Sequence, residues 1–163
     1  VLAADTLEKI RPEAARLKVR VAEDDRWEDV VLRMMAEHIE PHLGLGRPCF
    51  LTDYPIAMAA LARPKPNDPR LAERFELYVC GVELANAFVE LTDAEAQRTR
   101  LVADNALRKK LYGVDAQLDG DFLDALQHGM PQAAGIALGV DRLVMLATGA
   151  EDIADVVWQP VGD

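Results

Sequence analysis

The feature that most constrains the fold is a pair of β-prone runs, residues 74–79 and 83–91, with Cys80 and Gly81 between them. Short connections that contain glycine are typical of tight β-hairpins. The two strands of a hairpin are antiparallel, so this segment belongs in an antiparallel sheet. We therefore predict a sheet built around this hairpin.

Helical patterns lie on both sides of the hairpin. Apolar residues recur at helical spacing in residues 25–43, and Gly44 follows as a stop. Residues 92–95 fit a capping box that opens a helix running to Tyr112. The remaining predicted elements are helices at 6–17, 121–127 and 141–149, strands at 49–52 and 135–140, and a loop at 64–69. An antiparallel sheet with appended helices is an α+β fold.

Composition and charge narrow the class of protein. The chain has 163 residues, of which 50% are hydrophobic, enough for one globular domain or a large piece of one. The formal net charge of −10 argues against broad attraction to a nucleic-acid backbone. The apolar stretches are strand-sized, so we expect a cytoplasmic protein without a membrane partner. Cys49 and Cys80 lack metal-ligand spacing, and we expect both to be buried apolar residues.

Two glutamates of the hairpin can approach each other. With a two-residue turn, Tyr78 lies opposite Glu83 and Glu76 lies opposite Ala85, which places Glu76 and Glu83 diagonally on one face. Such carboxylates repel unless a cation lies between them, and Mg2+ carrying nucleotide phosphates is one candidate. Spacing alone favours the simpler alternative, that both glutamates are solvated on the outer face of an edge hairpin.

Asn86, Phe88 and Glu90 share one parity on the second strand of the hairpin. An amide, an aromatic ring and a carboxylate in a row suit a ligand that bears an ammonium group. Glu83 and Asn86 differ by an odd number, so an unbroken strand directs them to opposite faces. A common pocket for both therefore requires a bulge or a sharp twist near residues 84–85.

A third pattern covers residues 135–142, which read GIALGVDR. Glycines in a strand allow a flat ligand to approach the backbone, and an arginine at the following helix N-terminus can grip a phosphate. Glycine in a tightly packed central strand explains the same pattern equally well. The pattern lacks a Walker lysine and GxGxxG spacing, so a P-loop or Rossmann fold is disfavoured.

Together these segments resemble a known family. Residues 74–93 resemble the active-site hairpin of lysyl-tRNA synthetases and their paralogues, and GIALGVDRLVML at 135–146 resembles motif 3 of class II aminoacyl-tRNA synthetases. The resemblance implies ATP and Mg2+ as cofactors. It assigns the metal to Glu76 and Glu83, ATP to Glu83, Leu84, Gly139 and Arg142, and the amino acid to Asn86, Phe88, Glu90 and Ala137. Arg142 is the residue assigned to catalysis, and no protein nucleophile is implied.

Ala137 distinguishes two branches of this family. Lysyl-tRNA synthetases typically carry glycine at this position, whereas the ligases that attach (R)-β-lysine to elongation factor P carry alanine. One methyl group in a pocket is worth ~1–3 kcal/mol of discrimination. The resemblance therefore implies lysine or (R)-β-lysine as substrate and elongation factor P as acceptor, with tRNA-Lys as the alternative acceptor.

Motifs 1 and 2 of class II synthetases are not found in this sequence, and we expect them upstream of Val1. Residues 1–163 then form the C-terminal portion of a catalytic domain that is a homodimer in the full-length protein. We expect this portion alone to be inactive, because the motif 2 arginine that grips the α-phosphate is missing. A non-catalytic amino-acid or nucleotide-binding module is the alternative from another functional class.

Overall fold

A computed structural model describes residues 3–159, which divide into two compact units. Among the described residues the first unit comprises 3–51, 75–86 and 136–159, and the second comprises Thr52–Arg74 and Ala87–Gly135. Each unit is therefore discontinuous in sequence. Within the described residues, no helix is long and apolar enough to cross a membrane.

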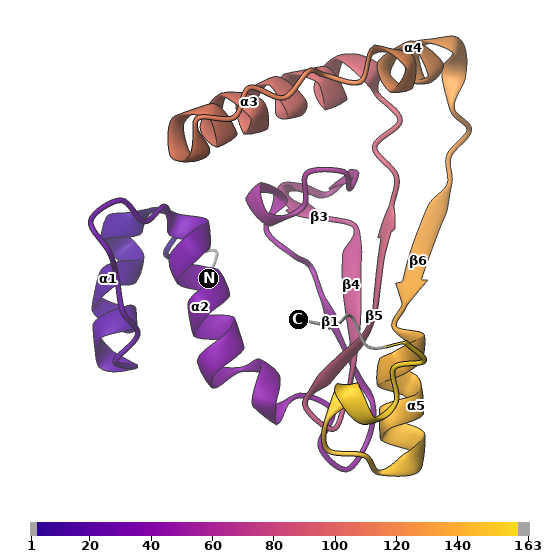
Figure 1. The fold of residues 1–163 in the computed structure, drawn as a ribbon. Helices are drawn as coiled ribbons and strands as arrows, with labels where there is room; N and C mark the ends of the chain where they lie inside the picture. Colours follow the sequence, from indigo (N-terminus) through magenta and orange to yellow (C-terminus); the bar gives the residue numbers. More distant parts are fainter. Residues whose placement is uncertain (1–2, 160–163) are drawn as a thin grey trace. The chain divides into compact units, whose positions relative to one another are not determined.

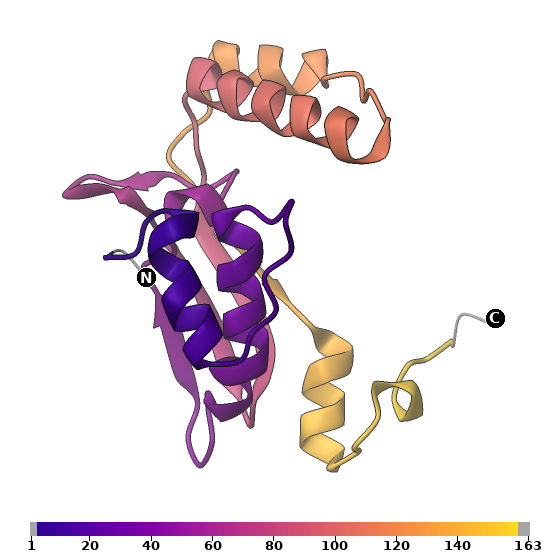
Figure 2. The same ribbon diagram turned by 90° about the vertical axis from the view of Figure 1, so that its left-hand side faces the viewer.

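The first unit begins with a helical pair, α1 (Leu7–Arg16) and α2 (Trp27–His38), which pack side by side in Figures 1 and 2. The predicted helix at 25–43 is too long, because the α-helix ends at His38 and a 3-10 turn, η1 (Glu40–His42), follows. Pro41 explains the change, since proline has no N–H to donate to the preceding turn.

Four strands form the main antiparallel sheet, in the order β1-β4-β5-β6. Their bounds are β1 Cys49–Thr52, β4 Arg74–Val79, β5 Val82–Val89 and β6 Ala134–Leu138. β4 and β5 are the predicted hairpin, and β6 lies at an edge of the sheet next to β5 (Figure 1). This sheet and its helices confirm the predicted α+β class.

The hairpin turn has the geometry that its sequence predicts. Cys80 has φ 53° and Gly81 has φ 78°, the left-handed values required by a type I′ turn. The loop after η1 supports the turn, because Cys80 N–H donates to Gly44 O at 3.0 Å and Gly81 N–H donates to Leu43 O at 2.8 Å. Cys80 is exposed at this turn, so the prediction that it is buried is wrong.

Pairing within the hairpin is irregular. A two-residue turn between β4 and β5 places Val79 opposite Val82, whereas farther along Val89 N–H donates to Glu73 O at 2.9 Å. Between these points the second strand advances seven residues, from 82 to 89, and the first advances six, from 79 to 73. The second strand therefore contains one additional residue, which is a β-bulge.

A side-chain hydrogen bond narrows the position of the bulge. Asn86 Nδ2 donates to Glu76 Oε1 at 3.2 Å, so these two side chains share a face of the sheet. In a regular hairpin they would point to opposite faces. The additional residue consequently lies between Val82 and Asn86, as the sequence predicted from the conflict in parity.

After β6 the first unit continues with α5 (Val140–Thr148), which ends at Gly149 with φ 71°, and then with the 3-10 turn η3 (Ile153–Asp155). The predicted helix at 141–149 is thus present. Glycine is favoured at this C-cap because the left-handed conformation is strained for other residues.

The second unit begins with η2 (Ile56–Met58) and a two-stranded ribbon made of β2 (Pro64–Lys65) and β3 (Asp68–Ala72). The prediction of a loop at 64–69 is therefore wrong for most of its length. Proline is tolerated here because in a two-stranded ribbon every strand has one edge that makes no ladder bonds.

Two helices complete the second unit, α3 (Ala94–Tyr112) and α4 (Gly120–Gly129), and they pack against each other (Figure 2). The N-cap of α3 is Asp93, whose Oδ1 accepts from Glu95 N at 3.0 Å and from Ala96 N at 2.9 Å. The capping box predicted to start at Thr92 is therefore displaced by one residue, because the aspartate supplies the cap.

Asp25 holds the loop between α1 and α2 against α2. Arg33 donates two hydrogen bonds to the Asp25 carboxylate, at 2.8 and 2.9 Å, and the Ala22 N–H donates a third at 2.6 Å. The Arg33 bonds and then the Ala22 bond lower the pKa of Asp25 to about 2. We expect Asp25→Asn to lower the free energy of unfolding by about 1 kcal/mol, as measured by thermal denaturation.

The effect of pH follows from the lowered pKa. The folded chain binds the Asp25 proton less tightly than the unfolded chain, so the stabilisation is present above the ordinary pKa of aspartate and is lost as pH falls toward about 2. Asp24→Asn, at an exposed neighbour, is the matched control. Equal stabilities of the two variants at neutral pH would contradict this role for Asp25.

Candidate functional site

Glu76 is a buried carboxylate in the middle of β4, with 6% of its surface exposed. The hydroxyl of Tyr78, itself 1% exposed, donates to Glu76 Oε2 at 2.7 Å, and Asn86 donates to Glu76 Oε1. Burial of a carboxylate is costly unless donors or cations compensate it. Glu76 is therefore not solvated on the outer face of the hairpin, which was the simpler alternative. It belongs to an internal polar cluster.

Glu83 and Arg142 meet at the start of α5. Arg142 Nη1 donates to the backbone oxygen of Glu83 at 2.7 Å and lies 3.6 Å from Glu83 Oε2. Both side chains are partly exposed, at 34% for Glu83 and 45% for Arg142. Because of this exposure the pair lies at the accessible edge of the cluster. An exposed arginine can replace its carboxylate partner with a phosphate oxygen.

Gly139 joins β6 to α5 beside that pair. Its N–H donates to Leu84 O at 2.9 Å, and it is the N-cap residue of α5. A Cβ atom at this position would lie 3.3 Å from Cδ of Arg142, a tighter contact than most real Cβ contacts. The absence of a side chain at 139 thus leaves room for the Arg142 side chain beside it.

Glu40 of η1 is a third carboxylate in this cluster, and the sequence did not indicate it. Burial raises the pKa of Glu40, the charges of Glu76 and Glu83 raise it further, and a hydrogen bond with Tyr78 opposes them. Glu40 is the first residue of η1, which leads into the loop that supports the hairpin turn. No periodic pattern links residue 40 to residues 76 and 83, which explains why sequence reasoning missed it.

The cluster can be tested for its fit to a cation. In the described part of the chain, His, Cys, Asp and Glu side chains form no group of three or more arranged to hold a metal ion. A magnesium ion bound with nucleotide phosphates needs only one or two protein carboxylates. Burial is the main cause of the raised pKa of Glu40, but the charges of Glu76 and Glu83 also raise it, and a divalent cation would offset those charges. The donor set therefore fits magnesium carried by phosphates.

Ala137 lies in β6, whose five residues are all exposed. Its neighbours Ile136 and Leu138 are 62% and 47% exposed. The alternative of a tightly packed central strand is therefore wrong for these residues. Their small and apolar side chains line an open edge of the sheet in the first unit.

Phe88 and Glu90 belong to the second unit. Phe88 packs against a cluster of alanines at positions 59, 62 and 72. Glu90 N–H donates to Ala133 O at 3.0 Å, and a Cβ atom at Gly135 would lie 3.3 Å from Glu90 Oε1. Glycine at 135 thus leaves room for the Glu90 carboxylate. A site that combines these two residues with those of the first unit stays a prediction.

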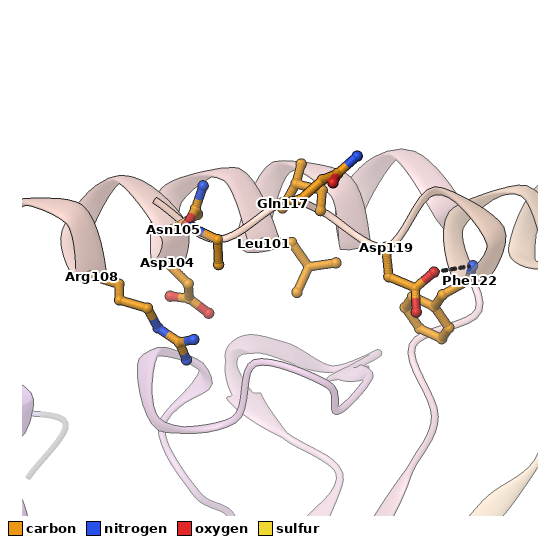
Figure 3. A pocket seen from close by; sticks show the side chains of 9 residues that line it. Leu101, Asp104, Asn105, Arg108, Gln117, Asp119 and Phe122 are labelled. Atoms are coloured by element: carbon orange, nitrogen blue, oxygen red, sulfur yellow. Dashed lines mark hydrogen bonds between the residues drawn. The ribbon is translucent and has the colours of Figure 1, made fainter. Parts of the chain in front are cut away.

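The second unit also has a hollow of its own. A cavity of about 280 Å³ lies between α3 and the segment leading to α4 (Figure 3). Leu101 and Phe122 supply apolar surface, Arg108 and Asp119 lie toward opposite ends of the labelled group, and Asp119 also caps α4 by accepting from Phe122 N–H. None of the predicted site residues lines this cavity.

Comparison with known proteins accords with this arrangement. Residues 8–162 match the family described as class II tRNA synthetases (D, K and N), and the chain therefore belongs to that family.

Among curated proteins the chain is similar to elongation factor P–(R)-β-lysine ligases. It is 46% identical to that of Proteus mirabilis over 98% of the chain, 44% identical to that of Yersinia enterocolitica over 99%, and 47% identical to that of Haemophilus influenzae over 89%. These matches cover 50%, 50% and 45% of the respective relatives. The chain thus spans about half the length of the curated relatives it matches.

The raised pKa of Glu40 gives a prediction for the cluster. The folded chain binds the Glu40 proton more tightly than the unfolded chain, so this group stabilises the fold below the ordinary pKa of glutamate and loses that contribution as pH rises through the raised value. Glu40→Gln removes the titration. We expect the thermal midpoint of the variant, relative to that of the original chain, to rise between pH 4 and pH 7.

Glu37→Gln is the control for this experiment, because Glu37 is an exposed glutamate on α2. Its midpoint should follow that of the original chain across the same pH range. A Glu40→Gln variant with the same pH dependence as Glu37→Gln would show that Glu40 is not coupled to the other carboxylates.

Proposed function

We propose that this chain is part of an ATP-dependent ligase that activates (R)-β-lysine and transfers it to a lysine of elongation factor P. The observation that carries the proposal is 44–47% identity, over most of the chain, to proteins named for that activity. The buried Glu76 with its amide and hydroxyl partners supports a working site. Burying a carboxylate costs stability, so a protein that keeps one is expected to use it for function.

The proposed reaction has two steps. A carboxylate oxygen of the amino acid attacks the α-phosphorus of ATP, and the bond to pyrophosphate breaks as the new P–O bond forms. The lysine amine of elongation factor P then attacks the acyl carbon, AMP leaves with the bonding pair, and the amine proton passes to solvent. Both steps depend on positioning and charge neutralisation rather than on a protein nucleophile.

Residues of the first unit would hold the nucleotide. Arg142 would exchange its 3.6 Å contact with Glu83 for phosphate oxygens, which frees the Glu83 carboxylate. Glu76 and Glu83 would hold Mg2+, which supplies charge neutralisation when bound. The backbone at Leu84, fixed by its bond from Gly139, would pack beside the adenosine.

Four residues would recognise the amino acid. Glu90 would pair with an ammonium group, Phe88 would pack along the aliphatic chain, and Asn86 would orient the substrate through its amide. The methyl group of Ala137, on the exposed β6, would favour the displaced amine of β-lysine over α-lysine.

A lysyl-tRNA synthetase fragment is the second candidate, because the class II family of this chain is described for the D, K and N synthetases. Ala137 and the net charge of −10 both favour a protein acceptor over tRNA-Lys. A non-catalytic binding module is disfavoured by the intact set of Glu76, Glu83, Glu90 and Arg142. A cytoplasmic location and a homodimeric full-length protein remain parts of the proposal.

The substrate preference can be tested with Ala137→Gly in the full-length protein. We expect the ratio of kcat/KM for (R)-β-lysine to that for α-lysine to fall ~10-fold or more, because one methyl group in a pocket discriminates by that order. Amino-acid-dependent pyrophosphate exchange measures both values.

Ala134→Gly, at another exposed alanine of β6, is the matched control and should leave the ratio unchanged. If the ratio is unchanged for Ala137→Gly as well, Ala137 only packs at the sheet edge. The preference for the ligase over a lysyl-tRNA synthetase would then lose its main support among the residues of the site.

A further inference from the structure

Arg100, in the second turn of α3, makes an unusual set of contacts in the second unit. Its Nη1 donates to the backbone oxygens of Ala60 and Ala62 at 2.9 Å and of Ala59 at 3.2 Å. These carbonyls follow directly after the 3-10 turn η2. One guanidinium nitrogen therefore donates hydrogen bonds to three carbonyls of residues 59–62, a segment with little regular structure.

The same segment pairs with the end of β5. Ala62 forms an isolated antiparallel bridge with Glu90. Leu91 N–H donates to Leu61 O at 3.0 Å, and Arg63 N–H donates to Val89 O at 2.8 Å. The backbone on both sides of Glu90 is thus fixed by Leu61 and Arg63, which adjoin the alanines that Arg100 contacts.

Phe88 depends on the segment too. Its ring packs with Ile56 against Ala59 and Ala62, which are 6% and 1% exposed. A shift of residues 59–62 would therefore move the packing surface of Phe88 together with the ladder partner of Glu90. On its other side the Glu90 N–H donates to Ala133 O, and the hydrogen bonds of Arg100 in the described structure go to residues 59–62 rather than to Ala133.

We propose that Arg100 is a positioning residue for the amino-acid subsite, which fixes Glu90 and Phe88 by holding the segment 59–62 through its three carbonyl contacts. This inference rests on the proposed function for the roles of Glu90 and Phe88. The contacts themselves lie within one unit and are independent of that function.

The chemistry of arginine suits this task. A guanidinium has several donors in a fixed plane, whereas a lysine ammonium presents a compact charge and a glutamine amide has no charge. Burial lowers the pKa of Arg100, and the charge of Asp104 opposes this effect. Arginine remains protonated in proteins despite such shifts, so the three carbonyls face a permanent cation.

The first test is hydrogen exchange on the chain itself. Arg100→Gln should speed exchange at the amides of Leu91 and Arg63. Leu91 N–H donates to Leu61 O in the segment 59–62, and Arg63 N–H, directly after this segment, donates to Val89 O. The amide of Glu90, bonded to Ala133, is the internal reference and should change less. Arg108→Gln, at an exposed arginine of the same helix, is the matched control. Uniform acceleration at all three amides would overturn the local role.

The second test separates binding from catalysis in the full-length protein. Arg100→Gln should raise the KM for the amino acid roughly fivefold to tenfold in pyrophosphate exchange, with the KM for ATP changed less than about twofold. Arg100→Lys should recover part of the loss because it keeps a charged donor. If Arg100→Gln does not fold, the Lys variant carries the same comparison, and an unchanged amino-acid KM in a folded variant overturns the proposal.

A double-mutant cycle with Glu90→Gln distinguishes the two levels of inference. If Arg100 acts through Glu90, Arg100→Gln should change the amino-acid KM much less in the Glu90→Gln background. Full additivity would overturn the positioning role while leaving the proposed function intact. An unchanged amino-acid KM for Glu90→Gln alone would instead count against the assignment of Glu90, and hence against the proposed function.

Discussion

The buried carboxylate of Glu76 constrains the hairpin more than any other group of the first unit. It is satisfied by the hydroxyl of Tyr78 and the amide of Asn86, and the second bond is possible only if Asn86 shares its face of the sheet. That requirement explains the additional residue in β5, which costs a regular ladder but changes the parity of the strand. The bulge is therefore the means by which an alternating strand supplies two kinds of side chain to one cluster.

A second consequence is electrostatic. Glu40 and Glu83 add negative charge near Glu76, and the pKa of Glu40 is raised because burial and these neighbours disfavour its ionised form. Arg142 offsets part of this charge from the N-terminal turn of α5, through its contacts with Glu83. A cluster with several carboxylates and one partly exposed arginine is suited to receive a cation with phosphates, in accord with the function proposed for this member of the class II family.

Much of this arrangement follows from local sequence. Cys80-Gly81 specifies the turn, and Gly113 and Gly149 end their helices, because each glycine takes a left-handed conformation. The bulge was predictable only because two expectations conflicted. The alternation of a regular strand directs Glu83 and Asn86 to opposite faces, whereas the family resemblance assigns both to one site. The contributions of Glu40 and Arg100 could not be predicted, because both depend on irregular segments, at 40–44 and 59–62, whose positions no periodic pattern encodes. The ribbon β2–β3 was missed because its prolines resemble those of a loop.

We propose that the amino acid recognised through this hairpin is passed to elongation factor P. Intact-mass measurement tests it directly, with the full-length protein, ATP, Mg2+ and (R)-β-lysine incubated with elongation factor P or with tRNA-Lys. We expect a mass increase of one β-lysyl residue on elongation factor P and no acylation of the tRNA. Acylated tRNA-Lys together with unmodified elongation factor P would contradict it.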